Sequence, residues 1–324
     1  MVPESDLASV RVGNFFRPRR LGHANLFVAD YVEAQKFYFS VAGIHEAYRQ
    51  PDNMASFITN GNTYHDFGLT DIRSPYAPKG QKPGLFHLAL ELENEVDLVA
   101  GYKLACAAGV KFSHTRDHDV AHSLYLRDPD GNMIEIYADV IRDWWTNRHG
   151  TIIKKKPEYI PGISSVPTAE INYPVNPEIK TVPEAIFHSQ RVAHVALATA
   201  NLSEMIRFYV DVIGLSPVCV NERSHAVLRG TDSLGVITLL NLRPGMVTGF
   251  HHVGIEVESE SNLDQALIQL AEKGIAVQRH VEHPARRAVS ILDSSGIPTQ
   301  FFVNRDWRPT VIATIDEDQV PYIL

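Results

Sequence analysis

Three residues in the first half of the chain have the types and placement of a metal-ligand set. His23 and His87 each open an alternating apolar segment, and Glu135 stands within the apolar run MIEIY. A carboxylate buried in an apolar strand needs a partner, so the alternative of three unrelated polar residues explains Glu135 poorly. Two imidazoles and one carboxylate form the facial triad of non-haem Fe(II) oxygenases, which leaves coordination positions open. We therefore expect His23, His87 and Glu135 to bind one metal ion.

The two histidines occupy matching positions of an internal repeat. Each of four segments runs from a His at the start of an alternating apolar strand, through a helix, to a Gly that suits a helix C-cap. These segments are His23–Gly43, His87–Gly109, His194–Gly214 and His252–Gly274. The first and third have equal lengths, and so do the second and fourth, so the registers match without a gap.

Strand-rich segments follow the helices, which predicts units of one strand, one helix and several strands. MASFIT and YHDFGLT complete the first unit, and HSLYLRD and MIEIYAD, joined by a turn at Asp128–Asn132, complete the second. We expect an α+β fold of four βαβββ units in two tandem domains. Residues 1–145 would form the N-terminal domain with the metal site, 146–188 a proline-rich connector, and 189–324 the C-terminal domain.

The second half repeats the histidines but not the carboxylate. Gln300 occupies the position that matches Glu135, at the same spacing from His252 as Glu135 has from His87. A neutral amide is a poor replacement for a carboxylate that helps to neutralise Fe(II). We interpret the second half as a structural partner with a degenerate site. The alternatives are a weak second metal site and histidines, His194 among them, kept as core residues.

With these motifs in place, the chain resembles the vicinal oxygen chelate superfamily and, within it, the type I extradiol dioxygenases that cleave catechol rings. The resemblance covers residues 19–303 as architecture and is residue-specific in the first half. In that family the ligands are the first-strand His of one unit, the first-strand His of the next and a Glu in the last strand, which match His23, His87 and Glu135. One difference is that well-known two-domain members carry the metal in the C-terminal pair of units.

The resemblance also implies roles for residues outside the ligand set. Asn25, two positions after the first ligand, matches an Asn of some members, and His65 lies in a Tyr-His-Asp segment like their Val-His-Asp strand. The run from His118 through the DPDGN turn to Tyr137 is the most specific match. His118 then corresponds to the acid–base histidine, Tyr125 to a tyrosine that hydrogen-bonds the bound diol, and His65 to a residue that stabilises charge on the oxygen species.

The resemblance implies Fe(II) as the cofactor, with Mn(II) as the second choice, and a small aromatic diol and O2 as the partners. The expected reaction opens a catechol ring to a muconic semialdehyde-type product. Two other classes stay open. One is a non-redox metalloenzyme of the same superfamily, such as a glyoxalase, epimerase or thiol transferase. The other is a metal-free binding module.

The sequence gives weaker evidence for a lid over the site and for residues that bind the substrate. The connector at 146–188, together with Trp144 and Trp145 before it, is a candidate lid over the site, because structureless segments of this length are usually functional or linkers. Three arginines could pair with a carboxylate on a substrate, and the sequence selects none of them: Arg73, Arg116 and Arg127.

The composition describes an ordinary globular chain of 324 residues with a formal charge of −8. No long run of like charges occurs, so we expect no nucleic-acid partner and no membrane contact. Cys106 and Cys219 are the only cysteines, and the first residues lack a signal-peptide pattern, which predicts a reduced cytoplasmic protein. Members of the family that the chain resembles commonly assemble, and an exposed sheet edge favours assembly, so we expect a homo-oligomer.

Overall fold

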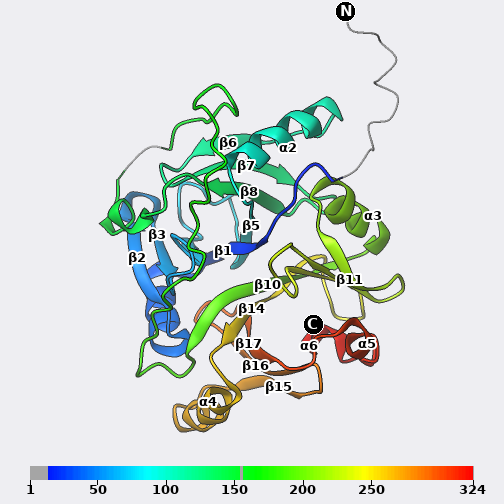
Figure 1. The fold of residues 1–324 in the computed structure, drawn as a ribbon. Helices are drawn as coiled ribbons and strands as arrows, with labels where there is room; N and C mark the ends of the chain where they lie inside the picture. The colour runs from blue at the N-terminus through cyan, green and yellow to red at the C-terminus, as the bar shows by residue number, and fades with distance from the viewer. Residues whose placement is uncertain (1–13, 154–155, 324) are drawn as a thin grey trace, which may run out of the picture.

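The computed structural model describes residues 14–153 and 156–323, which form two β-sheets of the same construction (Figure 1). Each sheet combines two units of one strand, one helix and three further strands. The first unit comprises β1 (Arg20–Val28), α1 (Tyr31–Phe37) with the π-helical turn η2 (Tyr38–Ala42), β2 (His45–Gln50), the 3-10 turn η3 (Pro51–Asn53), β3 (Ala55–Thr59) and β4 (Phe67–Asp71). The second comprises β5 (Gly84–Glu91), α2 (Glu95–Ala107), β6 (His114–Asp117), β7 (Ala121–Arg127) and β8 (Met133–Asp139).

The second half repeats this order. Between the two halves lie a 3-10 turn η4 (Trp144–Thr146) and the short strand β9 (Gly150–Thr151), which belongs to the first sheet. The third unit comprises β10 (Ser189–Thr199), α3 (Leu202–Arg207), the π-helical turn η5 (Phe208–Val212), β11 (Ser216–Asn221), β12 (His225–Arg229) and β13 (Ile237–Asn241). The fourth comprises β14 (Gly249–Val257), α4 (Glu260–Glu272), β15 (Val277–Glu282), β16 (Arg286–Leu292) and β17 (Pro298–Asn304), and α5 (Pro309–Ile312) and α6 (Val320–Ile323) follow it. The predicted α+β fold of four βαβββ units in two tandem domains is confirmed.

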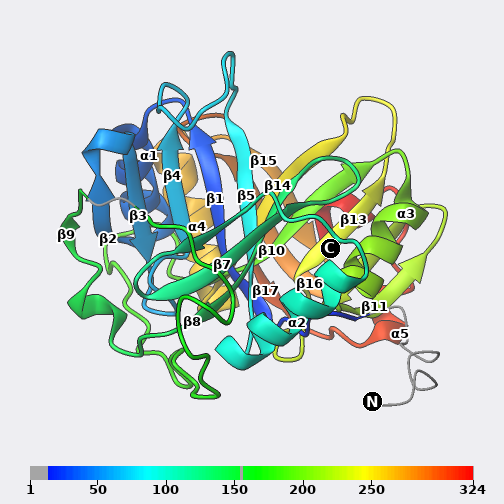
Figure 2. The same ribbon diagram turned by 90° about the horizontal axis from the view of Figure 1, so that it is seen from above.

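The first strands of paired units lie next to each other within each sheet. The nine-stranded sheet has the order β6-β7-β8-β5-β1-β4-β3-β2-β9, and the eight-stranded sheet has the order β11-β12-β13-β10-β14-β17-β16-β15. Figure 2 shows the two sheets side by side. The antiparallel pairs β1–β5 and β10–β14 therefore bring together the histidine-bearing strands of each half. Within the described ranges, no helix is long and apolar enough to cross a membrane.

The two halves dock through a reciprocal pair of hydrogen bonds. Tyr38 OH from η2 donates to Asp293 Oδ2 at 3.3 Å, and Tyr209 OH from η5 donates to Asp128 Oδ2 at 3.0 Å. Both aspartates stand in the turn between the last two strands of a unit, so the first unit packs against the fourth and the third against the second. One cluster of buried hydrophobic residues runs through both halves.

Local sequence signals fix the ends of the first helix. Asp30 Oδ1 accepts hydrogen bonds from the backbone N–H groups of Val32 at 2.9 Å and Glu33 at 3.1 Å, which caps α1. The helical segment ends at Gly43, whose φ of 75° is left-handed. A Cβ at this position would also collide with the backbone carbonyl of Phe187. The expected helix end at Gly43 is confirmed.

Two elements differ from the sequence prediction. The expected strand YHDFGLT begins only at Phe67, because Asp66 Oδ2 accepts hydrogen bonds from Thr59 Oγ1 and Asn60 N, both at 2.9 Å, and so holds a loop. His65 therefore lies in this loop and not in a strand. The connector also contributes β9, which pairs in parallel with β2 and forms one edge of the first sheet.

Candidate metal centre and active-site cavity

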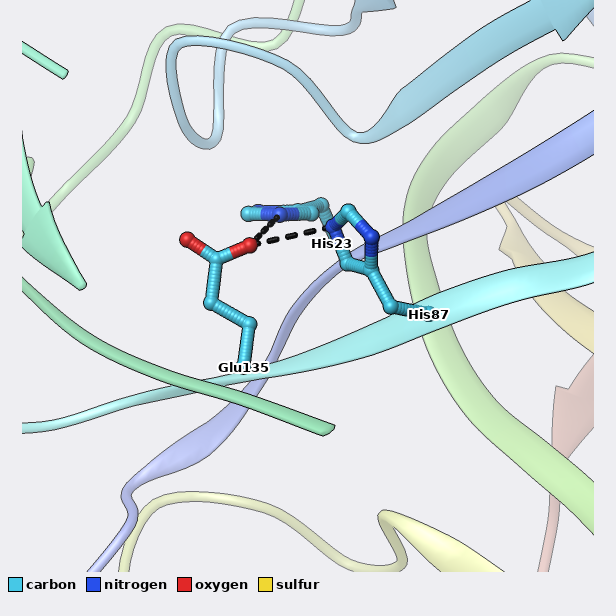
Figure 3. Close-up of side chains that lie close together, drawn as sticks. All are labelled: His23, His87 and Glu135. Carbon is cyan, nitrogen blue, oxygen red and sulfur yellow. Dashed lines mark hydrogen bonds and ion pairs between the residues drawn. The ribbon is translucent and has the colours of Figure 1, made fainter. Parts of the chain in front are cut away.

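The three expected ligands come from three adjacent strands and meet at one point (Figure 3). His23 on β1 lies opposite Ala89 of β5, and Ala89 lies opposite Glu135 of β8. His87, two residues before Ala89, points to the same face because side chains alternate along a strand. The Nε2 atoms of His23 and His87 lie 3.1 and 3.0 Å from Glu135 Oε2. The sheet register thus joins residues that are distant in sequence.

This cluster is buried, and its charges suit a metal ion. His23, His87 and Glu135 are 1%, 5% and 1% exposed. In the part of the chain that the structure describes, only imidazole nitrogens lie within ion-pair distance of the Glu135 carboxylate. Burial by itself raises the pKa of Glu135, but the facing imidazoles outweigh it and hold the pKa well below its usual value. An ionised carboxylate and two imidazoles, with ligand atoms all within 4.8 Å of one another, fit a divalent cation.

His118 and Tyr125 lie beside this cluster. Tyr125 on β7 stands directly opposite Glu135 on β8 in the antiparallel ladder. The hydroxyl of Tyr125 and Nε2 of His118 are 3.0 Å apart, and His118 Nε2 is 4.0 Å from Glu135 Oε1. Burial, followed by the charge of Lys156, lowers the pKa of His118 well below its usual value. Burial and the Glu135 charge raise the pKa of Tyr125 well above its usual value. His118 is therefore a neutral base and Tyr125 a protonated donor near neutral pH.

His65, in the loop before β4, and Asn25, on β1, also line the site. The His65 ring lies 4.1 Å from the His23 ring, measured between centroids, and neither of its nitrogens has a hydrogen-bond partner among the described residues. Burial, with a contribution from His23, lowers the pKa of His65 well below its usual value. Asn25 pairs across the ladder with Gly68, and a Cβ on Gly68 would overlap the Asn25 side chain. The absence of a side chain at Gly68 thus creates the space for Asn25.

All seven expected site residues line one cavity of about 430 Å³. Sequence reasoning missed several further lining side chains: Tyr48, Phe57, Phe86, His114 and Lys156. His114 stacks on Tyr125, with ring centroids 4.3 Å apart and planes at 10°. The sequence did contain a signal for His114. It stands at every second position with Arg116 and His118, which also line the cavity, and every second side chain of a strand points to the same face. Of the three arginines left open by the sequence, Arg116 alone reaches this cavity.

The connector reaches the cavity through Lys156, whereas Trp144 and Trp145 do not line it. Trp144 is buried in a small hydrophobic cluster with Tyr64 and Tyr137, whose rings both contact His23. Trp145 is 52% exposed. The expectation that the tryptophans cover the site is therefore wrong, because Trp144 packs behind the aromatic residues that support the ligands. A closing role for the connector stays a prediction.

The equivalent position in the second half has a different chemistry. His194 Nε2 and His252 Nε2 lie 3.2 Å apart. Gln300 Oε1 accepts a hydrogen bond from Arg286 Nη1 at 3.0 Å, and Gln300 Nε2 donates to the Tyr322 carbonyl at 2.6 Å. Burial and the Arg286 charge lower the pKa of His194 well below its usual value. The buried Arg286 guanidinium would repel a metal cation at this position. Its presence supports the interpretation of a degenerate site.

Paired βαβββ units that carry a buried His-His-Glu cluster define a class of proteins with one metal-binding fold. This chain belongs to the Glyoxalase/Bleomycin resistance protein/Dioxygenase superfamily, whose family model matches residues 20–136 and 191–301. The two matched regions correspond to the two sheets. The resemblance to the vicinal oxygen chelate superfamily is therefore confirmed.

The chain is also similar to several known proteins and solved structures. It is 27% identical over 199 residues to a catechol-2,3-dioxygenase of Bacillus subtilis, a match that covers 61% of this chain and 66% of that protein. A 2,3-dioxygenase structure from Pseudomonas sp. KL28 has a TM-score of 0.66 at 17% identity, covering 89% of this chain and 93% of the other. A Mn(II)-bound glyoxalase from Novosphingobium aromaticivorans has a TM-score of 0.63 at 16% identity, covering 90% and 85%. The structural matches establish the fold.

Proposed function

We propose that this chain is an Fe(II)-dependent extradiol dioxygenase that opens the aromatic ring of a catechol with O2 to a muconic semialdehyde-type product. Mn(II) is the alternative metal. The observation that carries the proposal is the convergence in one cavity of His23, His87 and Glu135 with the hydrogen-bonded pair His118–Tyr125. When bound, the metal would supply Lewis acidity, redox chemistry and coordination positions for the diol oxygens and O2.

His118 and Tyr125 divide the proton chemistry. The neutral His118 imidazole accepts the proton that a diol hydroxyl loses on binding, and the resulting imidazolium returns a proton when the oxygen–oxygen bond breaks. Tyr125 stays protonated because its pKa is raised, so its hydroxyl donates a hydrogen bond to a bound diol oxygen. The two groups are 3.0 Å apart, so both would reach the same substrate oxygen.

His65 and Asn25 complete the polar surface of the cavity. The His65 ring has a buried donor without a partner among the described residues, so it can stabilise negative charge that develops on a neighbouring oxygen. Asn25 places a buried amide on the same strand as His23. We assign these two residues to electrostatic stabilisation and to positioning of the substrate.

A non-redox metalloenzyme of the same superfamily is the second candidate, because the Mn(II)-bound glyoxalase shares the fold. The lining of the cavity favours the dioxygenase. Glu135 is the sole acidic residue among the described cavity-lining residues, whereas a glyoxalase site normally carries more carboxylates. A glyoxalase reaction also does not call for His65, His118 and Tyr125 together.

Oxygen uptake tests the proposal. Protein loaded anaerobically with Fe(II) is mixed with a panel of catechols, and an oxygen electrode and the absorbance of the yellow product follow the reaction. Glu135→Ala should abolish uptake, and Gln300→Ala, at the equivalent position of the second half, should leave it unchanged. Absence of uptake with every diol would reject the dioxygenase and favour the non-redox class.

Assembly and location stay predictions. The strands β6 and β9 end the first sheet, and β11 and β15 end the second. Such edges present unpaired backbone groups to a second copy, so we propose a homo-oligomer. Light scattering of the purified protein measures its mass. The cytoplasmic location is proposed from the cysteine content.

A further inference from the structure

The cavity contains more positive charge than its single carboxylate requires. Its lining includes two basic side chains, Arg116 and Lys156, and one acid, Glu135. Glu135 faces the two ligand imidazoles and would be neutralised by the metal ion. The diol oxygens would also bind that ion. Neither basic side chain is therefore needed to balance the catalytic centre.

Neither basic side chain has an acidic partner in the described structure. Arg116 Nη1 donates to the backbone carbonyl of Thr115 at 3.0 Å and makes no ion pair among the described residues. Lys156 Nζ lies 5.5 Å from the centroid of the Phe57 ring, likewise without a carboxylate within ion-pair distance among these residues. A half-buried cation without a counter-ion is unfavourable, so a ligand that supplies a negative charge would be stabilised here.

Other arginines near the site are already engaged. Arg73 binds Asp71 and Asp30. Arg148 donates to the backbone carbonyl of His118 and lies 3.5 Å from an oxygen of Asp119. Among the residues that the structure describes, Arg116 and Lys156 thus lack the acidic partners that Arg73 and Arg148 have.

Both cations are held in place by the fold. Arg116 lies on β6 and shares its face with His114, because side chains alternate along the strand. Lys156 lies between two points at which the connector is attached to the first domain. On one side Gly150–Thr151 pairs with β2, and on the other the Pro157 carbonyl accepts a hydrogen bond from Asp117 N at 2.9 Å.

A buried cluster secures the second attachment. Tyr159 OH donates to Glu95 Oε1 at 3.0 Å, and His122 Nδ1 lies 2.7 Å from the same oxygen. The rings of Tyr159 and His122 stack with centroids 4.0 Å apart. Ser165 Oγ also donates to Glu95 Oε1 at 2.7 Å. The connector is therefore pinned three residues after Lys156, and this cluster acts as a positioning device for the lysine.

We propose that Arg116 and Lys156 form an anion subsite that selects catechols carrying a carboxylate group. This inference rests on the proposed ring-cleaving function and names its substrate class. Arg116 presents a planar fork of donors that matches a carboxylate, and Lys156 adds a second positive charge from the connector. Burial lowers the pKa of Lys156 to about 8; the charges of Arg148 and Arg116 add to this effect, and those of Glu135 and Asp119 oppose it, so the lysine is mostly charged at neutral pH.

Matched pairs of ligands test the subsite. The acid 3-(3,4-dihydroxyphenyl)propionate, its 2,3-dihydroxy isomer and the methyl esters of both have the same catechol ring with and without the charge. Their dissociation constants are measured anaerobically by calorimetry on the metal-loaded full chain, and their turnover by oxygen uptake. We expect at least one acid to bind about 10 to 100 times more tightly than its ester, as charge-assisted hydrogen bonds would give.

Three variants assign the effect to the two residues. Lys156→Met and Arg116→Met should each reduce the preference for the acid by about 10-fold and leave ester binding unchanged. Lys111→Met is the matched control, because Lys111 is exposed and does not line the cavity. Unfolding curves confirm that each variant is folded.

The outcomes separate this inference from the proposed function. Turnover of esters and acids at equal efficiency, with variants that behave as wild type, would overturn the anion subsite and leave the dioxygenase intact. Absence of binding and turnover for all four compounds and for unsubstituted catechol would reject the proposed function and the subsite together. An acid preference lost in both cavity variants and kept in Lys111→Met supports the subsite.

Discussion

Glu91 is the centre of a buried ion cluster behind the metal site, and replacing it with Gln tests how this cluster stabilises the protein. Its carboxylate is 0% exposed and accepts hydrogen bonds from Arg19 Nη1 at 2.5 Å and Arg20 Nε at 2.7 Å. Tyr137, whose ring centroid lies 5.2 Å from that of His23, donates its hydroxyl to Glu91 Oε1 at 3.3 Å. Glu91→Gln keeps the shape and removes the charge. The buried Arg20 then loses its acidic partner among the described residues, whereas Arg19 keeps Asp232 at 2.6 Å.

The repeat provides a control with almost the same geometry. Arg191 Nε lies 2.7 Å from Glu256 Oε2, the same distance as in the Arg20–Glu91 pair, but these side chains are 36% and 25% exposed. Removing one partner of a buried pair costs about 3–5 kcal/mol, so Glu91→Gln should lower the free energy of unfolding by this amount. Glu256→Gln should lower it by about 0–1 kcal/mol, as for surface pairs.

Urea unfolding followed by circular dichroism measures both changes. Burial raises the pKa of Glu91, but Arg20 and Arg19 outweigh it, so the folded-state pKa is below its usual value. The contribution of the carboxylate is therefore complete above the usual pKa of about 4.3 and is lost as the pH falls through the folded-state value. The difference between wild type and Glu91→Gln should be constant near neutral pH and shrink below about pH 4. A cost for Glu91→Gln no larger than that for Glu256→Gln would refute the reasoning.

Further predictions concern the site. His118→Gln should lower turnover by about 10²–10⁴-fold with catechol binding retained, and steady-state oxygen uptake at wild-type rate would exclude its proton-transfer role. Tyr125→Phe should weaken catechol binding by about 0.5–1.5 kcal/mol in anaerobic titrations, because one hydrogen bond is lost. Chelation of metal held at 100 times its dissociation constant should lower the free energy of unfolding by about 2.7 kcal/mol, and Glu135→Gln protein should show no such change. The preference for carboxylated catechols should fall as the pH rises through about 8, because burial lowers the pKa of Lys156 and the lysine then loses its charge, whereas the profile of Lys156→Met should be flat in that range.

The convergence of His23, His87 and Glu135 was predictable from sequence because all three residues lie on regular elements. His23 and His87 occupy equivalent positions within β1 and β5, and Glu135 stands in the short strand β8 after a turn whose residues define it. Pairing of first strands then brings the histidines together, as the register of β1 and β5 shows. The docking of the two halves could not be predicted from the sequence, because the Tyr38–Asp293 contact joins residues that no local sequence pattern relates.

The sequence by itself determined the duplicated fold and the convergence of His23, His87 and Glu135, because strand alternation and repeat spacing are local properties of the chain. Only the tertiary structure decided which further side chains enter the cavity. Lys156 does so because a pinned connector with no periodic pattern crosses the domain, and Trp144 does not because it packs behind the ligands. Gln300 has nearly the shape of Glu135, and only the tertiary structure shows that its amide oxygen accepts a hydrogen bond from the buried Arg286.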